Sequence, residues 1–175
     1  MHEEITSILK SCSLSSALGD DELPFHFLKA LGEPVARVLT SLADACLKLK
    51  CYPTFLKTAR TIVLRKPGKS AYEVPNAWRP IALLKTISKV VKKLLAKRIR
   101  SVAEEHRLLH LSQIGARAKR GTGTALKLLT SMVQTVWKGG KDQVASLLSL
   151  NISRAFPTVN HTRLVANIRK LGFLS

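Results

Sequence analysis

The sequence predicts an α+β fold that is rich in helices and has few strands. Three stretches carry apolar residues at three- and four-residue spacing, which is typical of helices: residues 35–49, 83–99 and 125–137. Two short runs rich in β-branched and other apolar residues, 61–64 and 144–152, indicate strands. Because helices and strands do not alternate in a regular β-α-β rhythm, we expect an α+β arrangement rather than an α/β one.

The N-terminal stretch differs from the rest of the chain in pattern and charge. Residues 1–22 show weak periodicity, with serines clustered at 11–16 and an acidic run that ends at Glu22. Residues 1–33 hold two basic and six acidic side chains, a net charge of −4. We therefore expect residues 1–22 to form a weakly ordered acidic segment.

The next elements follow from local signals. Pro34 suits the first turn of the helix over 35–49, which Pro53 should end. The strand at 61–64 leads into the turn Lys66–Lys69, and the segment up to Trp78 looks irregular. The helix over 83–99 carries five lysines largely off its apolar stripe, at positions 85, 89, 92, 93 and 97. These lysines fit a solvated face and a nucleic-acid contact equally well.

The last third begins with a basic loop from Gly115 to Gly123. In the helix over 125–137, Met132 lies on the apolar stripe, so we expect it in the core. The strand over 144–152 follows, and a final helix should begin near Asn160 and end at Gly172.

Charge and composition narrow the function. The chain has 175 residues and a net charge of +18, and residues 34–175 alone carry +22. An excess of this size favours a polyanionic partner, so we expect nucleic acid rather than a merely solvated surface. Aromatic residues make up only 5%, which argues against a sheet that stacks RNA bases on many rings.

Cysteine usage and hydropathy point to the inside of a cell. The three cysteines, Cys12, Cys46 and Cys51, form no C-x-x-C pair and read as reduced thiols. No apolar run approaches the ~20 residues of a membrane span, and the start lacks the order of a secretory signal. We therefore expect an intracellular protein with no membrane partner.

Carboxylates suited to metal catalysis are scarce. Nucleotidyl transfer commonly uses two divalent ions about 4 Å apart, held by acidic side chains. Beyond residue 33 the sequence has five: Asp44, Glu73, Glu104, Glu105 and Asp142. None lies on or just after the strand over 144–152, so the residues alone predict no metal site.

Four ordered blocks carry a family resemblance. They are RTIVLRKPGK (60–69), WRPIALLKTISKVVKKLLAKRI (78–99), LSQIGARAKRGTGTAL (111–126) and LLSLNISRAFPTVNHTRL (147–164). In order and spacing they resemble the reverse transcriptases of non-LTR (LINE-type) retrotransposons, of the kind found in fungal genomes. The resemblance covers residue 23 to the end. It implies a right-hand polymerase with fingers over 23–143 and the start of the palm over 144–175, with the rest of the palm expected beyond Ser175.

The resemblance also implies roles for individual residues. Lys66 and Arg79 match basic fingers residues that hold the incoming triphosphate. Phe156 matches the aromatic residue that lies under the sugar and excludes a 2′-hydroxyl. Four residues match the motif that cradles the template: Gln113, Gly115, Arg117 and Arg120.

The first palm motif departs from the family pattern of Asp, three residues and Ala-Phe-Asp. Asn151 stands where the family has its metal-binding Asp, and Pro157 replaces the second Asp. Arg154 replaces a usual Gly. A neutral amide is a poor substitute for a carboxylate on Mg²⁺, so we expect no metal and no cofactor in this chain, although the intact family uses Mg²⁺.

Three hypotheses follow. The chain is a catalytically inactive piece of an RNA-directed DNA polymerase, a surviving non-catalytic module that binds nucleic acid, or the truncated gene model of a functional element. In the intact family the partners are RNA and DNA as template and primer, together with deoxynucleoside triphosphates. The family implies a nuclear location, with a mitochondrial one as the alternative.

Overall fold

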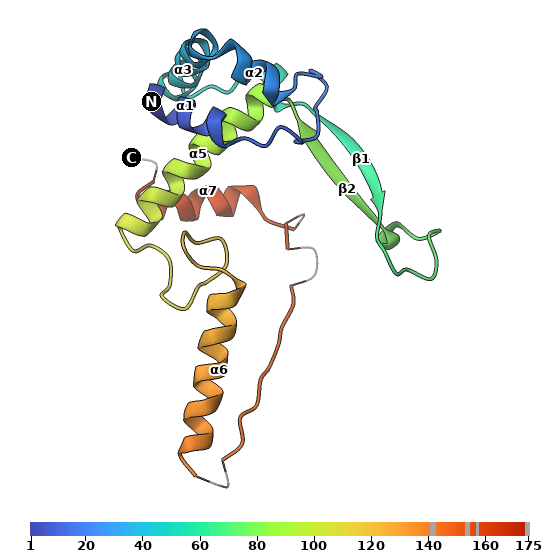
Figure 1. The fold of residues 1–175 in the computed structure, drawn as a ribbon, viewed down its shortest axis with the longest axis vertical. Coiled ribbons are helices and arrows are strands. Elements are labelled where there is room, and N and C mark those ends of the chain that lie inside the picture. The colour runs from blue at the N-terminus through green and yellow to red at the C-terminus, as the bar shows by residue number, and fades with distance from the viewer. Residues whose placement is uncertain (141–142, 153–154, 157, 174–175) are drawn as a thin grey trace. The chain divides into compact units, whose positions relative to one another are not determined.

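The computed structural model describes residues 1–140, 143–152, 155–156 and 158–173, and its elements are drawn in Figure 1. The chain divides into two compact units, Met1–Lys97 and Arg98–Ser175. Within the described residues, helices dominate and the sheet has two strands, which agrees with the predicted α+β class. The elements of the first unit are α1 (His2–Ser11), α2 (Phe25–Leu31), α3 (Glu33–Lys48), α4 (Thr54–Lys57), β1 (Ala59–Arg65), the 3₁₀ turn η1 (Pro75–Ala77), β2 (Trp78–Leu84) and the start of α5 (Thr86–Glu105).

The core of the first unit lies where α1, α2, α3 and α5 meet. Their apolar positions recur every three or four residues, so each helix turns one stripe inward. The buried side chains from these helices form one cluster: Ile5, Ile8, Leu9, Phe25, Leu28, Ala36, Leu39, Ala43, Val90 and Leu94. α1 is thus part of the core.

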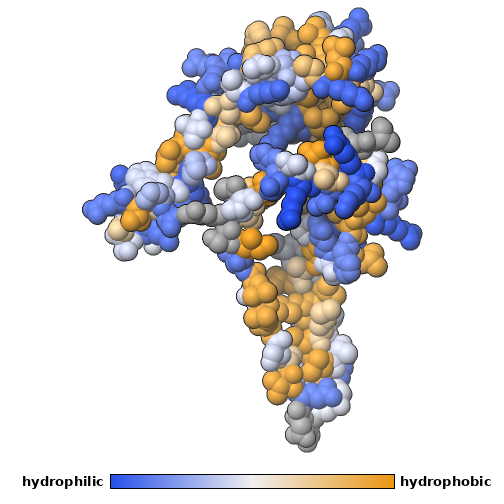
Figure 2. Space-filling model, turned by 180° about the vertical axis from the view of Figure 1, so that it is seen from behind, coloured by the Kyte–Doolittle hydropathy of each residue, from blue (hydrophilic) through white to orange (hydrophobic). Residues whose placement is uncertain are grey.

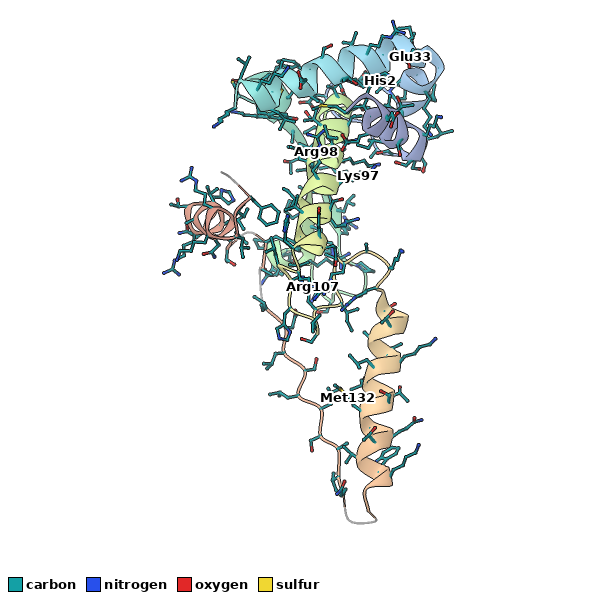
Figure 3. The ribbon with its side chains drawn as sticks, turned by 90° about the vertical axis from the view of Figure 1, so that its left-hand side faces the viewer. His2, Glu33, Lys97, Arg98, Arg107 and Met132 are labelled. Carbon is teal, nitrogen blue, oxygen red and sulfur yellow. The ribbon has the colours of Figure 1, made fainter. Side chains whose placement is uncertain are left out.

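The N-terminal segment differs from its prediction as a weakly ordered stretch. Residues His2–Ser11 form α1, and Ile5 is completely buried. The prediction rested on the acidic and serine-rich composition of the stretch, whereas the three- and four-residue spacing of Ile5, Ile8 and Leu9 is a helical signal. At the surface, His2 Nε2 lies 3.1 Å from a carboxylate oxygen of Glu33, which links α1 to α3 (Figure 3).

The acidic run before α2 is fixed against the start of α5. Asp21 Oδ2 accepts a hydrogen bond from the Thr86 backbone N–H at 2.6 Å, and Thr86 Oγ1 donates to the Leu23 carbonyl at 2.6 Å. A carboxylate stabilises a helix N-terminus by satisfying a free N–H and by opposing the helix dipole. Gly19 also lies here, and a Cβ at that position would collide with the Leu84 carbonyl.

Three lysines, two in α5 and one just before it, contact their own chain. Lys89 Nζ donates to the Ala17 carbonyl, and Lys93 Nζ lies 3.1 Å from Cys12 Sγ. Lys85 Nζ sits over the Phe55 ring at 5.7 Å from its centroid. The first two contacts tie the N-terminal segment to α5, and the third is made to α4. These lysines therefore have intramolecular partners, beside the solvated face and the nucleic-acid contact that the sequence left open.

The strands β1 and β2 form an antiparallel hairpin that extends away from the helices of its unit (Figure 1). β1 confirms the predicted strand at 61–64, whereas β2 was not predicted: the sequence left residues 79–82 unassigned and gave Leu83 and Leu84 to the following helix. Pro80 lies within β2, where a proline weakens a strand pattern because it cannot donate to the ladder. α5 accordingly begins at Thr86 rather than at residue 83.

The second unit contains the end of α5, then α6 (Thr122–Lys138) and α7 (His161–Lys170). Both helices agree with the periodicity of the sequence. α7 begins as predicted, because the Asn160 side chain accepts a hydrogen bond from the Arg163 N–H at 2.9 Å.

The predicted strand over 144–152 is not formed. The described residues 143–152 are extended but pair with no other strand, and their leucines, valine and isoleucine are exposed. A strand requires ladder hydrogen bonds to a neighbour, and β1 and β2 pair only with each other. The apolar pattern therefore identified an extended segment correctly, but the partner that would make it a strand is missing from the described structure.

α6 also buries less than its pattern predicts. Met132, expected in the core, is 58% exposed and lines a cavity of about 380 Å³ between α6 and residues 144–147 (Figure 3). Apolar side chains cover much of α6 and the neighbouring extended segment (Figure 2). An amphipathic helix needs a second surface to bury its stripe, and the extended segment covers it only in part.

Candidate nucleic-acid interface

The hairpin places Lys66 and Arg79 on one face. In the antiparallel register Leu64 pairs with Arg79, and residues that face each other across such a pair point to the same side. Lys66 continues this register, since its N–H donates to the Ala77 carbonyl at 2.8 Å. It lies two residues beyond Leu64 and so shares its face. The two residues predicted to hold a triphosphate are therefore neighbours.

A cluster of side chains at the tip stabilises this part of the hairpin. The Arg65 guanidinium lies 5.3 Å from the Tyr72 ring and 5.4 Å from the Trp78 ring, both within cation–π range. The two rings meet edge to face at 5.9 Å. We call Arg65, Tyr72 and Trp78 the tip cluster. No role was predicted for these three residues from the sequence, because the strand register that places Arg65 opposite Trp78 is seen only in the structure.

Hydrogen bonds connect the tip cluster to Lys66. The Tyr72 hydroxyl donates to the Lys66 carbonyl at 2.9 Å, and Trp78 Nε1 donates to the Tyr72 carbonyl at 2.9 Å. Lys66 Nζ itself donates to the Asn76 carbonyl at 2.7 Å. The backbone of Lys66 is held on both sides, and its ammonium group has a neutral partner that an anion can replace.

The predicted template residues occupy the loop between α5 and α6, all within the second unit. Arg117 makes a bidentate ion pair with Glu104, through Nε to Oε1 at 2.9 Å and Nη2 to Oε2 at 2.6 Å. Its side chain is 7% exposed, and Nη1 donates to the His110 carbonyl at 3.1 Å. Arg117 thus organises the loop from inside rather than facing solvent.

This ion pair perturbs both groups. The hydrogen bonds from Arg117 hold the pKa of the Glu104 carboxyl below its ordinary value of 4.5, against the opposing effect of partial burial. The same hydrogen bonds raise the pKa of Arg117. The pair is therefore charged over the whole neutral range.

The other template candidates also shape the loop. Arg120 Nη1 donates to the Leu111 carbonyl at 2.6 Å and to the Gln113 carbonyl at 3.3 Å. Gln113 Nε2 donates to the Gly115 carbonyl at 3.4 Å. The structure therefore brings all four predicted template residues into one loop, where two arginines bond the backbone.

The palm candidates lie on the exposed part of the second unit. Asn151 is exposed within the extended segment, and Phe156 is 92% exposed. Arg154 and Pro157, the other departures from the family motif, lie outside the described residues. Among the residues that the structure describes, no three His, Cys, Asp or Glu side chains gather closely enough to hold a metal ion.

A family model described as reverse transcriptase (RNA-dependent DNA polymerase) matches residues 64–175. The chain belongs to the reverse transcriptase family. The match starts inside the hairpin, at the residue that pairs with Arg79, and it includes the arginine loop and Asn151.

The similar proteins include RNA-directed DNA polymerases of non-LTR retrotransposons. It is 30% identical over 169 residues to the probable RNA-directed DNA polymerase from transposon BS of Drosophila melanogaster. It is 26% identical over 169 residues to the RNA-directed DNA polymerase from mobile element jockey of Drosophila funebris. Each alignment covers 97% of this chain and 18% of the relative, so the chain spans less than a fifth of their length.

A third relative is the retrovirus-related Pol polyprotein from type-1 retrotransposable element R2 of Popillia japonica. It is 28% identical over 120 residues, which is 69% of this chain and 16% of the relative. These relatives come from insects, so the fungal origin expected from the sequence stays a prediction. Within the described ranges, no helix is both long and apolar enough to cross a membrane.

Proposed function

We propose that this chain is the fingers region and first palm motif of a non-LTR reverse transcriptase, and that it binds nucleic acid and triphosphate without catalysing synthesis. The observation that carries the proposal is the shared, solvent-facing side of the hairpin on which Lys66 and Arg79 meet. Its support is the family match together with the +22 charge of residues 34–175. The partners are RNA and DNA as template and primer, and deoxynucleoside triphosphates.

Lys66 and Arg79 suit a triphosphate for different reasons. Arg79 offers a planar fork that pairs with two phosphate oxygens at once, while Lys66 supplies a compact charge. The bond from Lys66 Nζ to the Asn76 carbonyl positions the ammonium group near the tip before a ligand arrives. A phosphate oxygen makes a stronger, charge-assisted bond and would replace that carbonyl.

The arginine loop takes the template in this proposal, with a division of labour between its two arginines. Arg117 acts as a positioning residue, since its fork is already occupied by Glu104. Arg120 uses Nη1 for both of its hydrogen bonds to the loop within the described structure, so Nε and Nη2 remain for a template phosphate. Gly115 leaves room at the loop surface, because nothing lies within 4 Å of a Cβ built there.

The residues present do not fit the metal pair of a polymerase. Asn151 supplies a neutral amide where Mg²⁺ favours an anionic oxygen. Of the few carboxylates beyond residue 33, Asp44 is paired with Lys48 and Glu104 with Arg117. We therefore propose that the chain does not extend a primer, and that Phe156 is a sugar-gate residue without a reaction to gate.

Two alternatives make different predictions. A non-catalytic module selected for binding would retain salt-sensitive RNA affinity and would act outside retrotransposition. The truncated gene model of a functional element would continue in the genome into a Tyr/Phe-Ala-Asp-Asp block. Under either alternative, we propose that the chain is intracellular and expect it in the nucleus.

The test is a binding titration with the full 175-residue chain. Single-stranded RNA and inorganic tripolyphosphate are titrated separately, at several salt concentrations, against the chain and its Lys66→Ala and Arg79→Ala variants. We expect log affinity for RNA to fall linearly with log salt at roughly 0.7 per phosphate neutralised. We expect both variants to weaken tripolyphosphate binding. RNA affinity that does not respond to salt, or no tripolyphosphate binding by the parent chain, would contradict the proposal.

A further inference from the structure

The turn that ends α3 brings Cys46 and Cys51 together. The Cys51 N–H donates to the Cys46 carbonyl at 3.1 Å, and the Lys50 N–H donates to the Leu47 carbonyl at 3.3 Å. Lys50 has a φ of 50°, in the left-handed region. Two such nested bonds around one left-handed residue define a Schellman motif, in which the side chains of the first and last residues commonly meet. In this chain both of those residues are cysteines.

The backbone of this turn is compatible with a disulfide. A hydrogen bond of 3.1 Å, with the covalent bonds on either side of it, leaves the α-carbons of Cys46 and Cys51 at most about 7 Å apart. Cysteines whose α-carbons are farther apart than about 7 Å cannot be bridged without a movement of the backbone. Both thiols are free in the structure, so the pair meets the distance requirement in its reduced form.

Both cysteines also line one cavity, which lets a reagent approach them. The cavity has a volume of about 290 Å³ and lies between the end of α3, the turn and α5. Cys51 is exposed and Cys46 is half-buried. Among the described residues that line the cavity, the charged ones are Lys50 and Lys92. A lining that carries positive charge and no carboxylate attracts a small anion, and Cys51 is the thiol that such an anion meets first.

The remaining cysteine of the chain differs in every respect. Cys12 is 3% exposed and belongs to the core cluster of the first unit. Its Sγ lies 3.1 Å from Lys93 Nζ. Cys12 is therefore shielded from a reagent in the folded chain, and it serves as the internal control for the other two.

We propose that Cys46 and Cys51 form a redox-modification site, which reacts with a small anionic disulfide such as glutathione disulfide to give a reversible intramolecular disulfide. The Cys51 thiolate attacks one sulfur of the reagent, whose S–S bond breaks and releases one thiolate. The Cys46 thiolate then attacks Cys51 Sγ and displaces the second reagent thiolate. Two electrons pass from the cysteines to the reagent, and the two cysteine protons end on the released thiols. The inference goes beyond the proposed function and uses none of its residues.

Peptide mapping of the full chain tests the proposal. The reduced, folded chain is incubated with glutathione disulfide, alkylated in denaturant and digested with trypsin in the absence of a reductant. Trypsin cuts after Lys48 and Lys50, so residues 38–48 and 51–57 become separate peptides that a disulfide would hold together. We expect these two peptides to be recovered as one linked species that dithiothreitol separates, and Cys12 to be recovered alkylated.

A variant of one cysteine distinguishes the two steps. In Cys46→Ser the first attack can occur but the second cannot, so Cys51 should retain glutathione as a mixed disulfide. In the parent chain that adduct should not accumulate, because the Cys46 thiolate displaces it. Glutathione that remains on Cys51 in the parent chain would overturn the proposal, as would a disulfide that includes Cys12.

Two variants at position 50 separate the effect of the turn from mere closeness in sequence. Lys50→Gly favours the left-handed conformation and should leave the rate of disulfide formation unchanged or higher. Lys50→Pro fixes φ near −65° and removes the N–H, so it should slow disulfide formation at least about tenfold. Circular dichroism verifies that both variants keep their helices, and trypsin still cuts after Lys48 in each. Equal rates in the two variants would overturn the proposal. None of these outcomes depends on RNA or tripolyphosphate binding, so the proposed function stands or fails separately.

Discussion

Arg117 and Glu104 form a bidentate ion pair, with one oxygen of the carboxylate 2.6 Å from Nη2 and the other 2.9 Å from Nε. The pair joins the last turn of α5 to the loop that precedes α6. An arginine in a basic loop is ordinarily expected to face a polyanion. Here the Glu104 carboxylate, thirteen residues earlier, accepts hydrogen bonds from two N–H groups of the Arg117 guanidinium. An acidic residue therefore helps to fix the conformation of the loop.

Replacing Glu104 should loosen this loop in a pH-dependent way. Glu104→Gln removes the charge that holds Arg117 and should lower the melting temperature at pH 7. Because the folded-state pKa of Glu104 lies below the unfolded one, its stabilising contribution is complete above about pH 4.5 and is lost as the pH falls through the folded value. The difference in melting temperature between parent and variant should therefore close below pH 4.5. Glu105→Gln is the matched control. A difference that persists unchanged at pH 3 would contradict this account.

Asp21 should contribute to stability while its neighbour Asp20 should not. Asp21→Ala removes the acceptor of the Thr86 N–H at the start of α5 and should cost about 1 to 2 kcal/mol. Asp20 is exposed, so Asp20→Ala should change stability by less than about 0.5 kcal/mol. Urea unfolding followed by circular dichroism measures both. Equal effects for the two variants would mean that residues 19–22 do not cap α5 in solution.

The tip cluster should control how firmly Lys66 is held. Tyr72→Phe deletes only the hydroxyl that donates to the Lys66 carbonyl, and should lower the free energy of local opening by about 1 kcal/mol. An isolated two-stranded hairpin is marginally stable, so the effect should be visible in amide exchange of Lys66, whose N–H bonds Ala77. Tyr52→Phe, outside the hairpin, should have no effect there. If amide exchange at Lys66 were unchanged in Tyr72→Phe, the tip cluster would not stabilise the backbone of Lys66.

The extended segment 143–152 should drive self-association. Leu148 and Leu150 are largely exposed in an unpaired stretch, which is the situation of an unprotected sheet edge. Replacing both with lysine should raise the concentration at which the chain associates by at least about tenfold, since each buried leucine contributes roughly 1.5 kcal/mol or more. Leu14→Lys is the control at an exposed site elsewhere. Sedimentation velocity of a parent chain that stays monomeric at all concentrations would show this expectation to be wrong.

Helical periodicity gave the most accurate part of the fold. The stripes over 35–49, 83–99 and 125–137 correspond to α3, α5 and α6, with ends shifted by a few residues. Such a stripe is a local property of the chain, so it can be read without knowing the partner. Burial could not be read in the same way, since Met132 lies on a correct stripe and is still exposed.

Strand pairing and side-chain partners were harder to predict from the sequence than the helices. Residues 144–152 have a strand's composition but no partner within the described structure, and β2 has a partner but contains Pro80. The grouping of Lys66 with Arg79 was expected only through the family resemblance, while the register now gives its geometric basis. The ion pair between Arg117 and Glu104 links a loop to a helix, so no spacing pattern in the sequence could predict it.

One assay tests both whether the chain binds nucleic acid and whether it fails to extend a primer. A labelled DNA primer on an RNA template is incubated with the 175-residue chain carrying Asn151→Asp and Pro157→Asp, with Mg²⁺ or Mn²⁺ and all four deoxynucleoside triphosphates. Mobility shift and primer extension are measured in the same samples, and the unsubstituted chain is the control. We expect a salt-sensitive shift and no extension in either protein, because one restored motif does not provide the carboxylates that bring two ions within about 4 Å. Template-dependent extension by the double variant, or the absence of any shift, would contradict it.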